Sequence, residues 1–187
     1  MRSIIGIVLA ALFPMVLNAQ EITVSESSEK MGKEEMWCFS ARYNHDEEIT
    51  REVLGQRIME AGIKKGTEKK GVSIYKGATW NDISPAKCDY YLKTQSKKHK
   101  TTVYLCVSKG YNNFVTTAND AATAGNITAF LQKLEGQIAA AEAIKEKEAE
   151  LKAIEEKNKE AQRELERSRK EQAEKAGQLD DLKKGQK

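Results

Sequence analysis

The most restrictive feature of the chain is a long, highly charged stretch, residues 151–172, that contains no glycine, proline or aromatic residue. Across residues 145–175, ten basic side chains are balanced by ten acidic ones. Ala, Glu, Lys, Leu, Arg and Gln dominate the stretch, and these residues have high helix propensities. We therefore expect a continuous helix from about Asn119 to about Lys175, with a C-terminal stop at Gly177.

The charged stretch also has local pairs that favour a helix. Glu precedes Lys by four residues in four places, and each such pair contributes roughly 0.2–0.5 kcal/mol. The pairs are Glu148–Lys152, Glu155–Lys159, Glu166–Lys170 and Glu171–Lys175. At about 1.5 Å per residue, residues 127–175 would form a helix about 70 Å long, which exceeds the diameter of a small domain. Such a helix is suited to act as a spacer, a tether or a contact surface.

A heptad frame runs through the same stretch. Positions a and d of this frame hold Ile144, Leu151, Ile154, Ala161 and Leu165, with Asn158 at a further a position. Lys147 interrupts the frame early, and polar residues weaken it after Leu165. Three states are compatible with this pattern: a helix that stands alone, a weak parallel dimer, and disorder in the isolated protein. The composition resembles the Ala/Lys/Glu-rich helical spacers of envelope proteins such as TolA, and this resemblance implies a spacing role.

The first residues have the pattern of a secretory signal peptide. Arg2 precedes an apolar run over residues 4–17, and Asn18 and Ala19 then offer a small residue before a cleavage point. The run is shorter than the roughly 20 residues that a membrane span requires. We expect residues 1–19 to be removed and the protein to be exported, to the periplasm or the medium, without a transmembrane segment. A retained membrane anchor is the alternative.

The remaining chain predicts one small folded domain. After a flexible linker at 20–33, a strand at 34–43 and a helix at 44–66 are followed by three strands and the long helix. Residues 34–140 therefore read β-α-β-β-β-α, which predicts an α+β fold: a small two-layer α/β sandwich with both helices on one face of a largely antiparallel sheet. We expect residues 141–176 to form the extended charged helix, for which a coiled-coil dimer is one of the three states above, and residues 177–187 to form a frayed tail.

The three cysteines lie in the exported part, where an odd number leaves at least one thiol unpaired. The alternation of apolar residues predicts that Cys88 points into the core and Cys106 away from it. Cys38 shares a face with Cys106 if their strands are neighbours. Three outcomes stay open: free thiols, a Cys38–Cys106 disulfide, and a bond that involves Cys88.

Two places are candidates for ligand contact. Trp80 lies in an expected loop, where it would serve either as a stacking platform or as a cover for the open end of the core. The hairpin tip with Lys97, Lys98 and His99 is basic and would meet an anionic glycan, although lysines at a hairpin also discourage strand-to-strand aggregation.

No motif in the sequence indicates chemistry. We find no phosphate-binding glycine loop, no zinc-binding spacing and no nucleophile–base arrangement, so no catalytic, cofactor-binding or metal-binding residue is expected. The net charge of +3 is too small to indicate nucleic-acid binding. The leading hypothesis is an exported, non-catalytic bacterial envelope protein that binds another envelope protein, or itself through the long helix. One alternative is a periplasmic holdase similar to the Skp family, and another is a cell-envelope hydrolase.

Overall fold

The computed structural model describes residues 22–184, with side chains as far as residue 179. The expected signal peptide at 1–19 and the end of the expected tail lie outside the described residues. The chain divides at Ala139/Ala140 into two units. We refer to residues 22–139 as the sheet domain and to residues 140–184 as the charged segment.

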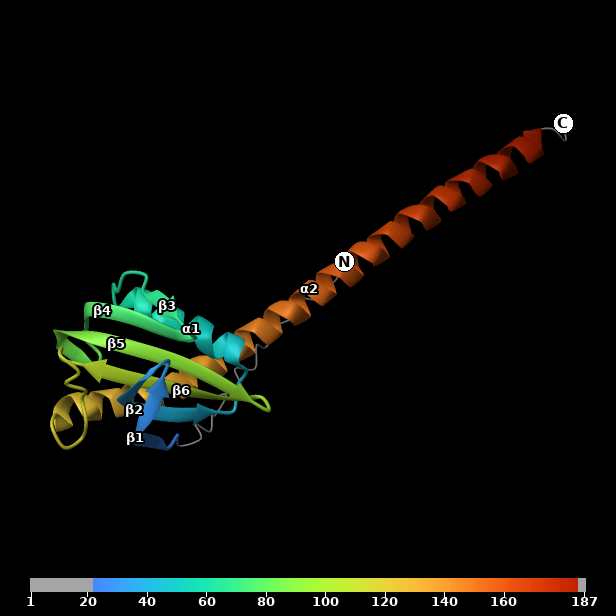
Figure 1. Ribbon diagram of the computed structural model, residues 1–187. Coiled ribbons are helices and arrows are strands. Elements are labelled where there is room, and N and C mark those ends of the chain that lie inside the picture. The colour runs from blue at the N-terminus through green and yellow to red at the C-terminus, as the bar shows by residue number, and fades with distance from the viewer. Residues whose placement is uncertain (1–21, 185–187) are drawn as a thin grey trace, which may run out of the picture. The chain divides into compact units, whose positions relative to one another are not determined.

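The sheet domain contains one six-stranded sheet in which every neighbouring pair is antiparallel (Figure 1). Its order is β1-β2-β6-β5-β4-β3. The strands are β1 Val24–Met31, β2 Glu34–Tyr43, β3 Thr67–Lys69, β4 Val72–Trp80, β5 Ser84–Lys97 and β6 Lys100–Ser108. The two helices are α1 Glu47–Glu60 and α2 Ala121–Lys184. The expected α+β fold is confirmed.

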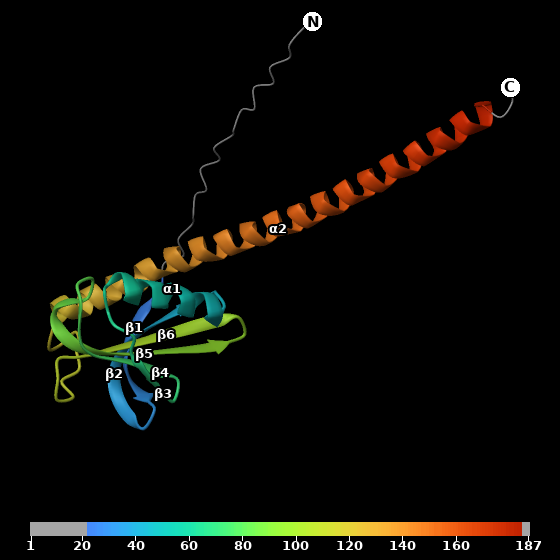
Figure 2. The same cartoon turned by 90° about the horizontal axis from the view of Figure 1, so that it is seen from above.

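Both helices of the sheet domain cover the same face of the sheet (Figure 2). At α1, the hydroxyl of Thr94 in β5 donates to the carboxylate of Glu47 at 2.7 Å. In the first part of α2, the backbone oxygen of Leu131 accepts a hydrogen bond from the hydroxyl of Tyr43 at 2.7 Å. Four aliphatic side chains of α2, spaced by four, three and four residues, are fully buried: Ile127, Leu131, Leu134 and Ile138. This apolar stripe explains why the first part of α2 lies on the sheet.

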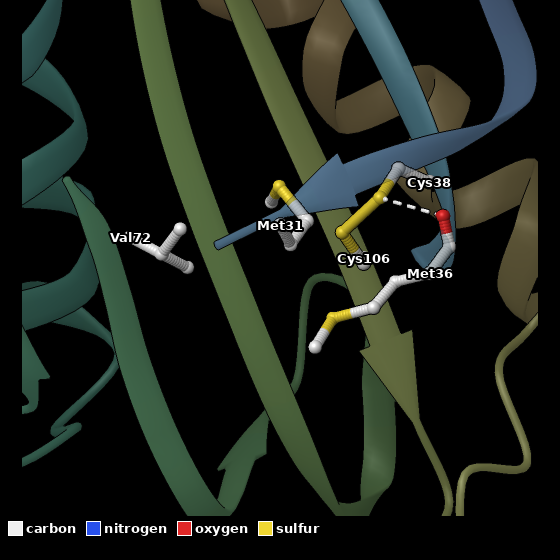
Figure 3. Packing of buried hydrophobic residues seen from close by; sticks show 5 residues of the cluster. All are labelled: Met31, Met36, Cys38, Val72 and Cys106. Carbon is white, nitrogen blue, oxygen red and sulfur yellow. Dashed lines mark hydrogen bonds between the residues drawn. A yellow bond between two sulfur atoms is a disulfide. The ribbon is translucent and has the colours of Figure 1, made fainter. Parts of the chain in front are cut away.

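A second cluster of buried side chains lies on the opposite face of the sheet (Figure 3). Met31 and Met36 come from the β1–β2 hairpin, whereas Val72 comes from β4. β6 and β5 separate β2 from β4 in the sheet, so this contact requires the sheet to curl toward its helix-free face. Both faces of β2 are therefore buried along its middle, with Phe39 toward the helices and Cys38 toward the second cluster.

The segment expected to be a flexible linker contains strand β1, so that expectation is wrong for Val24–Met31. The segment pairs with β2 along its whole length through a two-residue turn at Gly32 and Lys33. The carboxylate of Glu26 accepts hydrogen bonds from the backbone N–H and the hydroxyl of Thr117, at 3.1 and 2.5 Å. The side chains from Val24 to Lys30 are exposed or half-buried, so this strand needs no apolar alternation.

Helix α1 is shorter than the expected helix at 44–66. It ends at Glu60, and Gly62, two residues later, adopts a positive φ of 71°. The N–H of Gly62 donates to the oxygen of Met59, and the N–H of Ile63 donates to the oxygen of Ile58. These two hydrogen bonds form a Schellman motif. Ile58, which precedes Gly62 in the chain, and Ile63, which follows it, are both buried. Gly62, rather than Gly66, therefore terminates the helix.

The charged segment is helical from Ala140 to Lys184, and the stop expected at Gly177 is absent. Gly177 does not adopt a positive φ, and a single glycine inside a helix costs only about 1 kcal/mol. Side chains from 143 to 179 are all exposed. The four expected Glu–Lys pairs do not close into ion pairs among the described residues, and Lys147–Glu150 at 2.7 Å forms instead. No helix in the described part of the chain has the length and apolar character that a membrane crossing needs.

Candidate functional site

A groove of about 500 Å³ lies at the end of the β5–β6 hairpin and extends onto β2. Strand pairing builds its floor, because Arg42 of β2 is opposite Thr102 of β6, which is opposite Gln95 of β5. These three residues form one row across three strands, on the sheet face that the helices leave free. We call this feature the basic groove. Its lining residues are Arg42, Gln95, Lys97, Lys98, Lys100, Thr102 and Tyr104.

Four side chains in the lining of the basic groove are cationic. The described residues of this lining include no Asp or Glu. Lys97 and Lys100 are directly opposite each other in the sheet. Like charges at directly opposite positions destabilise a strand pair. The hairpin end therefore concentrates positive charge at a cost in stability, and an anion between the two ammonium groups would remove that cost.

Tyr104 completes the site with one aromatic contact. The ammonium group of Lys93 lies 5.6 Å from the centre of the Tyr104 ring, within the range of a cation–π interaction. Burial raises the pKa of Tyr104, as does the nearby charge of Glu29, while Arg42 lowers it. The net effect keeps the phenol protonated, so Tyr104 presents a hydrogen-bond donor at the groove.

The edge-protection alternative for these lysines applies only to the end of the β5–β6 hairpin. β5 and β6 lie in the middle of the sheet, with β2 and β4 as their outer neighbours. Pairing with β4 ends at Lys93, so only residues 94–97 of β5 extend past their neighbour. Lysines guard exposed strand edges, and Lys97 lies in this unpaired end of β5, so its position is compatible with edge protection as well as with ligand contact on the sheet face.

The structure brings together only part of the candidate set. Lys97 and Lys98 line the basic groove. His99 does not, because its Nδ1 lies 3.1 Å from the carboxylate of Asp46, at the start of α1. Lys98 and His99 have φ values of 51° and 57°, which form the two-residue turn between β5 and β6. Across this turn, the side chain of Lys98 lines the basic groove, whereas the side chain of His99 contacts Asp46.

Trp80 is not a ligand-contact residue, and its assignment as a stacking platform is wrong. The residue ends β4, and only 1% of its surface is exposed. Its ring lies 4.9 Å from Phe130 of α2 and 5.5 Å from Tyr90 of β5, measured between ring centres. Trp80 thus fills the space between the sheet and α2. This position agrees with the alternative interpretation, in which Trp80 covers the open end of the core.

Cys38 of β2 and Cys106 of β6 are joined by a disulfide, with their Cα atoms 4.1 Å apart. The two strands are neighbours, and both side chains point away from the helices into the second cluster. Cys88 is a buried free thiol, and its Sγ lies 3.7 Å from the hydroxyl of Ser84. In the β5–β6 hairpin Leu92 is opposite Leu105 and Tyr91 is opposite Cys106. Because side chains alternate between the two faces of a strand, this register puts Cys106 on the face opposite to that of Leu105, as expected.

Sequence reasoning missed Arg42, Gln95, Thr102 and Tyr104 as members of the site. Their face is readable from the alternation of each strand, but their proximity depends on the pairing of β2 with β6, two strands far apart in sequence. The histidines do not suggest another site, because His45 lies 3.2 Å from the carboxylate of Glu135 and His99 contacts Asp46. Among the described residues, no cluster of three or more His, Cys, Asp or Glu side chains is placed to hold a metal ion.

Comparison with known proteins provides no match: no family model matches the chain, no curated protein matches its sequence, and no solved structure matches its fold.

Proposed function

We propose that the chain is an exported, non-catalytic envelope protein that binds an anionic glycan in the basic groove. The observation that carries this proposal is the convergence of Arg42, Lys97, Lys98 and Lys100 without a carboxylate in the lining. Ammonium and guanidinium groups donate charge-assisted hydrogen bonds to carboxylate or sulfate oxygens. Thr102 and the Tyr104 hydroxyl supply neutral hydrogen-bonding groups, which suit sugar hydroxyls.

Export is supported by two independent features. The first residues have the pattern of a signal peptide. The Cys38–Cys106 disulfide is of the kind that persists in oxidising compartments, such as the periplasm and the medium.

We further propose that the charged segment acts as a spacer and self-association surface. The five large aliphatic side chains that are 53–60% exposed in this segment all occupy a or d positions of one heptad frame. They are Ile144, Leu151, Ile154, Leu165 and Leu179. Leu179 continues the frame after its polar interruption. Asn158 at an a position favours a parallel pair with a fixed register.

Glycan binding is tested by titration calorimetry of the mature chain with oligogalacturonate, an anionic glycan. The variant Lys97→Gln with Lys100→Gln should bind at least about ten-fold more weakly, equivalent to about 1.4 kcal/mol. The matched control is Lys152→Gln with Lys159→Gln, which removes the same charge from the charged segment and should leave the affinity unchanged. Equal losses in both variants would show that only net charge matters and would reject the basic groove.

Self-association is tested by sedimentation equilibrium of the mature chain. The wild type should dimerise with rising concentration, and Leu151→Glu with Leu165→Glu should be monomeric over the same range. A wild type that stays monomeric at every concentration would remove self-association and leave the spacer role alone.

A further inference from the structure

A second cavity lies on the curled face of the sheet, between the β1–β2 turn on one side and strands β3 and β4 on the other. Its volume is about 340 Å³, within the roughly 300–1,000 Å³ range typical of small-molecule sites. Because its walls come from the two opposite ends of the strand order, the curl of the sheet creates it. We call it the hairpin cavity.

The inner wall of the hairpin cavity is apolar. Met31, Met36 and Val72 belong to the buried cluster beside the disulfide (Figure 3). Ile74 and Tyr91 also line the cavity and are only half-buried, so they retain apolar surface for a ligand. Methionine side chains are flexible and polarizable, and they adapt to the shape of an alkyl chain.

The rim of the cavity is cationic. Lys33 lies in the β1–β2 turn, Lys69 and Lys70 lie at the β3–β4 turn, and Lys76 lies on β4. These four ammonium groups face a single carboxylate in the lining, that of Glu34. None of the four lysines forms an ion pair among the described residues. An apolar wall beneath an excess of positive charge complements a molecule with an alkyl chain and an anionic head.

We propose that the hairpin cavity binds a medium-chain fatty-acid anion, with the alkyl chain along Ile74 and Tyr91 and the carboxylate among the rim lysines. The volume accommodates one chain, and burying that chain removes apolar surface from water on both partners. The site is separate from the basic groove, since the two linings share no residue.

The test uses decanoate and the full mature chain labelled at its methionine methyl groups. The sequence has five methionines, and after removal of residues 1–19 Met31, Met36 and Met59 remain. Met59 is 71% exposed on α1 and does not line the cavity, so it serves as an internal reference. Saturable shifts of the Met31 and Met36 signals, with Met59 unchanged, are the expected result.

Two matched comparisons complete the experiment. The variant Lys69→Gln with Lys76→Gln should weaken decanoate binding at least ten-fold, whereas Lys64→Gln with Lys65→Gln, outside the cavity, should not. Decyltrimethylammonium, which has the same chain and the opposite charge, should produce no saturable shift. No shift of Met31 or Met36 below the micelle concentration, or equal binding of the two amphiphiles, would overturn the proposal. The groove variant Lys97→Gln with Lys100→Gln should retain decanoate binding, which separates this test from that of the proposed glycan site.

Discussion

The sheet domain and the charged segment share one helix but are stabilised in different ways. In the part of α2 within the sheet domain, Leu131, Leu134 and Ile138 are fully buried. In the charged segment, Ile144 and Leu151 are each 60% exposed. The same residue types in the same secondary structure thus serve tertiary packing in one region and leave a solvent-facing stripe in the other. The helical conformation of the charged segment must therefore rest on local propensity, or on a partner.

Removing the disulfide should produce the largest loss of stability. It links residues 68 positions apart, and loops of this size contribute roughly 3–5 kcal/mol through the entropy of the unfolded chain. Cys38→Ala with Cys106→Ala should lower the free energy of unfolding by that amount in urea denaturation. The helical signal of the charged segment should persist. A stability loss below that of Cys88→Ala, which deletes one buried sulfur atom, would contradict the assignment of this bond.

A matched pair of leucines compares the two regions directly. Leu134→Ala should cost about 2–5 kcal/mol, because it leaves a cavity in the core. Leu151→Ala, at an exposed site of the same helix, should change the free energy of unfolding of the monomer by less than about 0.5 kcal/mol. Both values come from denaturation of dilute protein. Similar costs at the two sites would mean that the charged segment is packed against something in the monomer.

The ion pair between Lys109 and Asp120, at the start of α2, should have a smaller effect on the free energy of unfolding, and this effect should depend on pH. A hydrogen bond from Lys109, followed by one from Thr123, lowers the pKa of Asp120 to about 2 from its ordinary 3.8. Because the folded-state pKa is depressed, this carboxylate stabilises the fold above the ordinary value, and the contribution disappears as the pH falls from about 4 toward 2. Asp120→Asn retains a capping side chain but should lose part of this pH dependence.

The measurement for Asp120 is the free energy of unfolding across that acidic range. The variant should destabilise less steeply than the wild type as the pH falls. Lys109→Gln should reproduce the change, since Lys109 is the largest cause of the depressed pKa. Identical pH profiles for all three proteins would refute this role of the ion pair.

The smallest expected effect lies in the charged segment. Glu155→Gln removes the attraction between Glu155 and Lys159, which lie four residues apart without a closed ion pair in the described part of the chain, so the loss of helix stability should not exceed roughly 0.2–0.5 kcal/mol. The side chains are exposed, so added salt should weaken the difference. Thermal melting followed by circular dichroism at low and high salt measures it. Insensitivity to salt would indicate that the charges do not support this helix.

The sequence predicts those features that depend on local pattern. The expected faces of Cys88 and Cys106 follow from periodicity and agree with the structure, and the buried stripe of α2 has the same kind of local origin. Strand β1 was not predictable in this way, because its side chains from Val24 to Lys30 are exposed or half-buried and show no apolar alternation. The curl of the sheet, which buries both faces of β2, depends on strand order. The basic groove likewise requires the pairing of Arg42 with Thr102, which no local signal reveals.

The central claim is that the charged segment holds its helix without the sheet domain. Circular dichroism of a peptide with residues 140–184, recorded over a range of concentrations, tests this claim most directly. We expect substantial helicity that increases with concentration, as local propensity and self-association together predict. A random-coil spectrum at every concentration would contradict the claim.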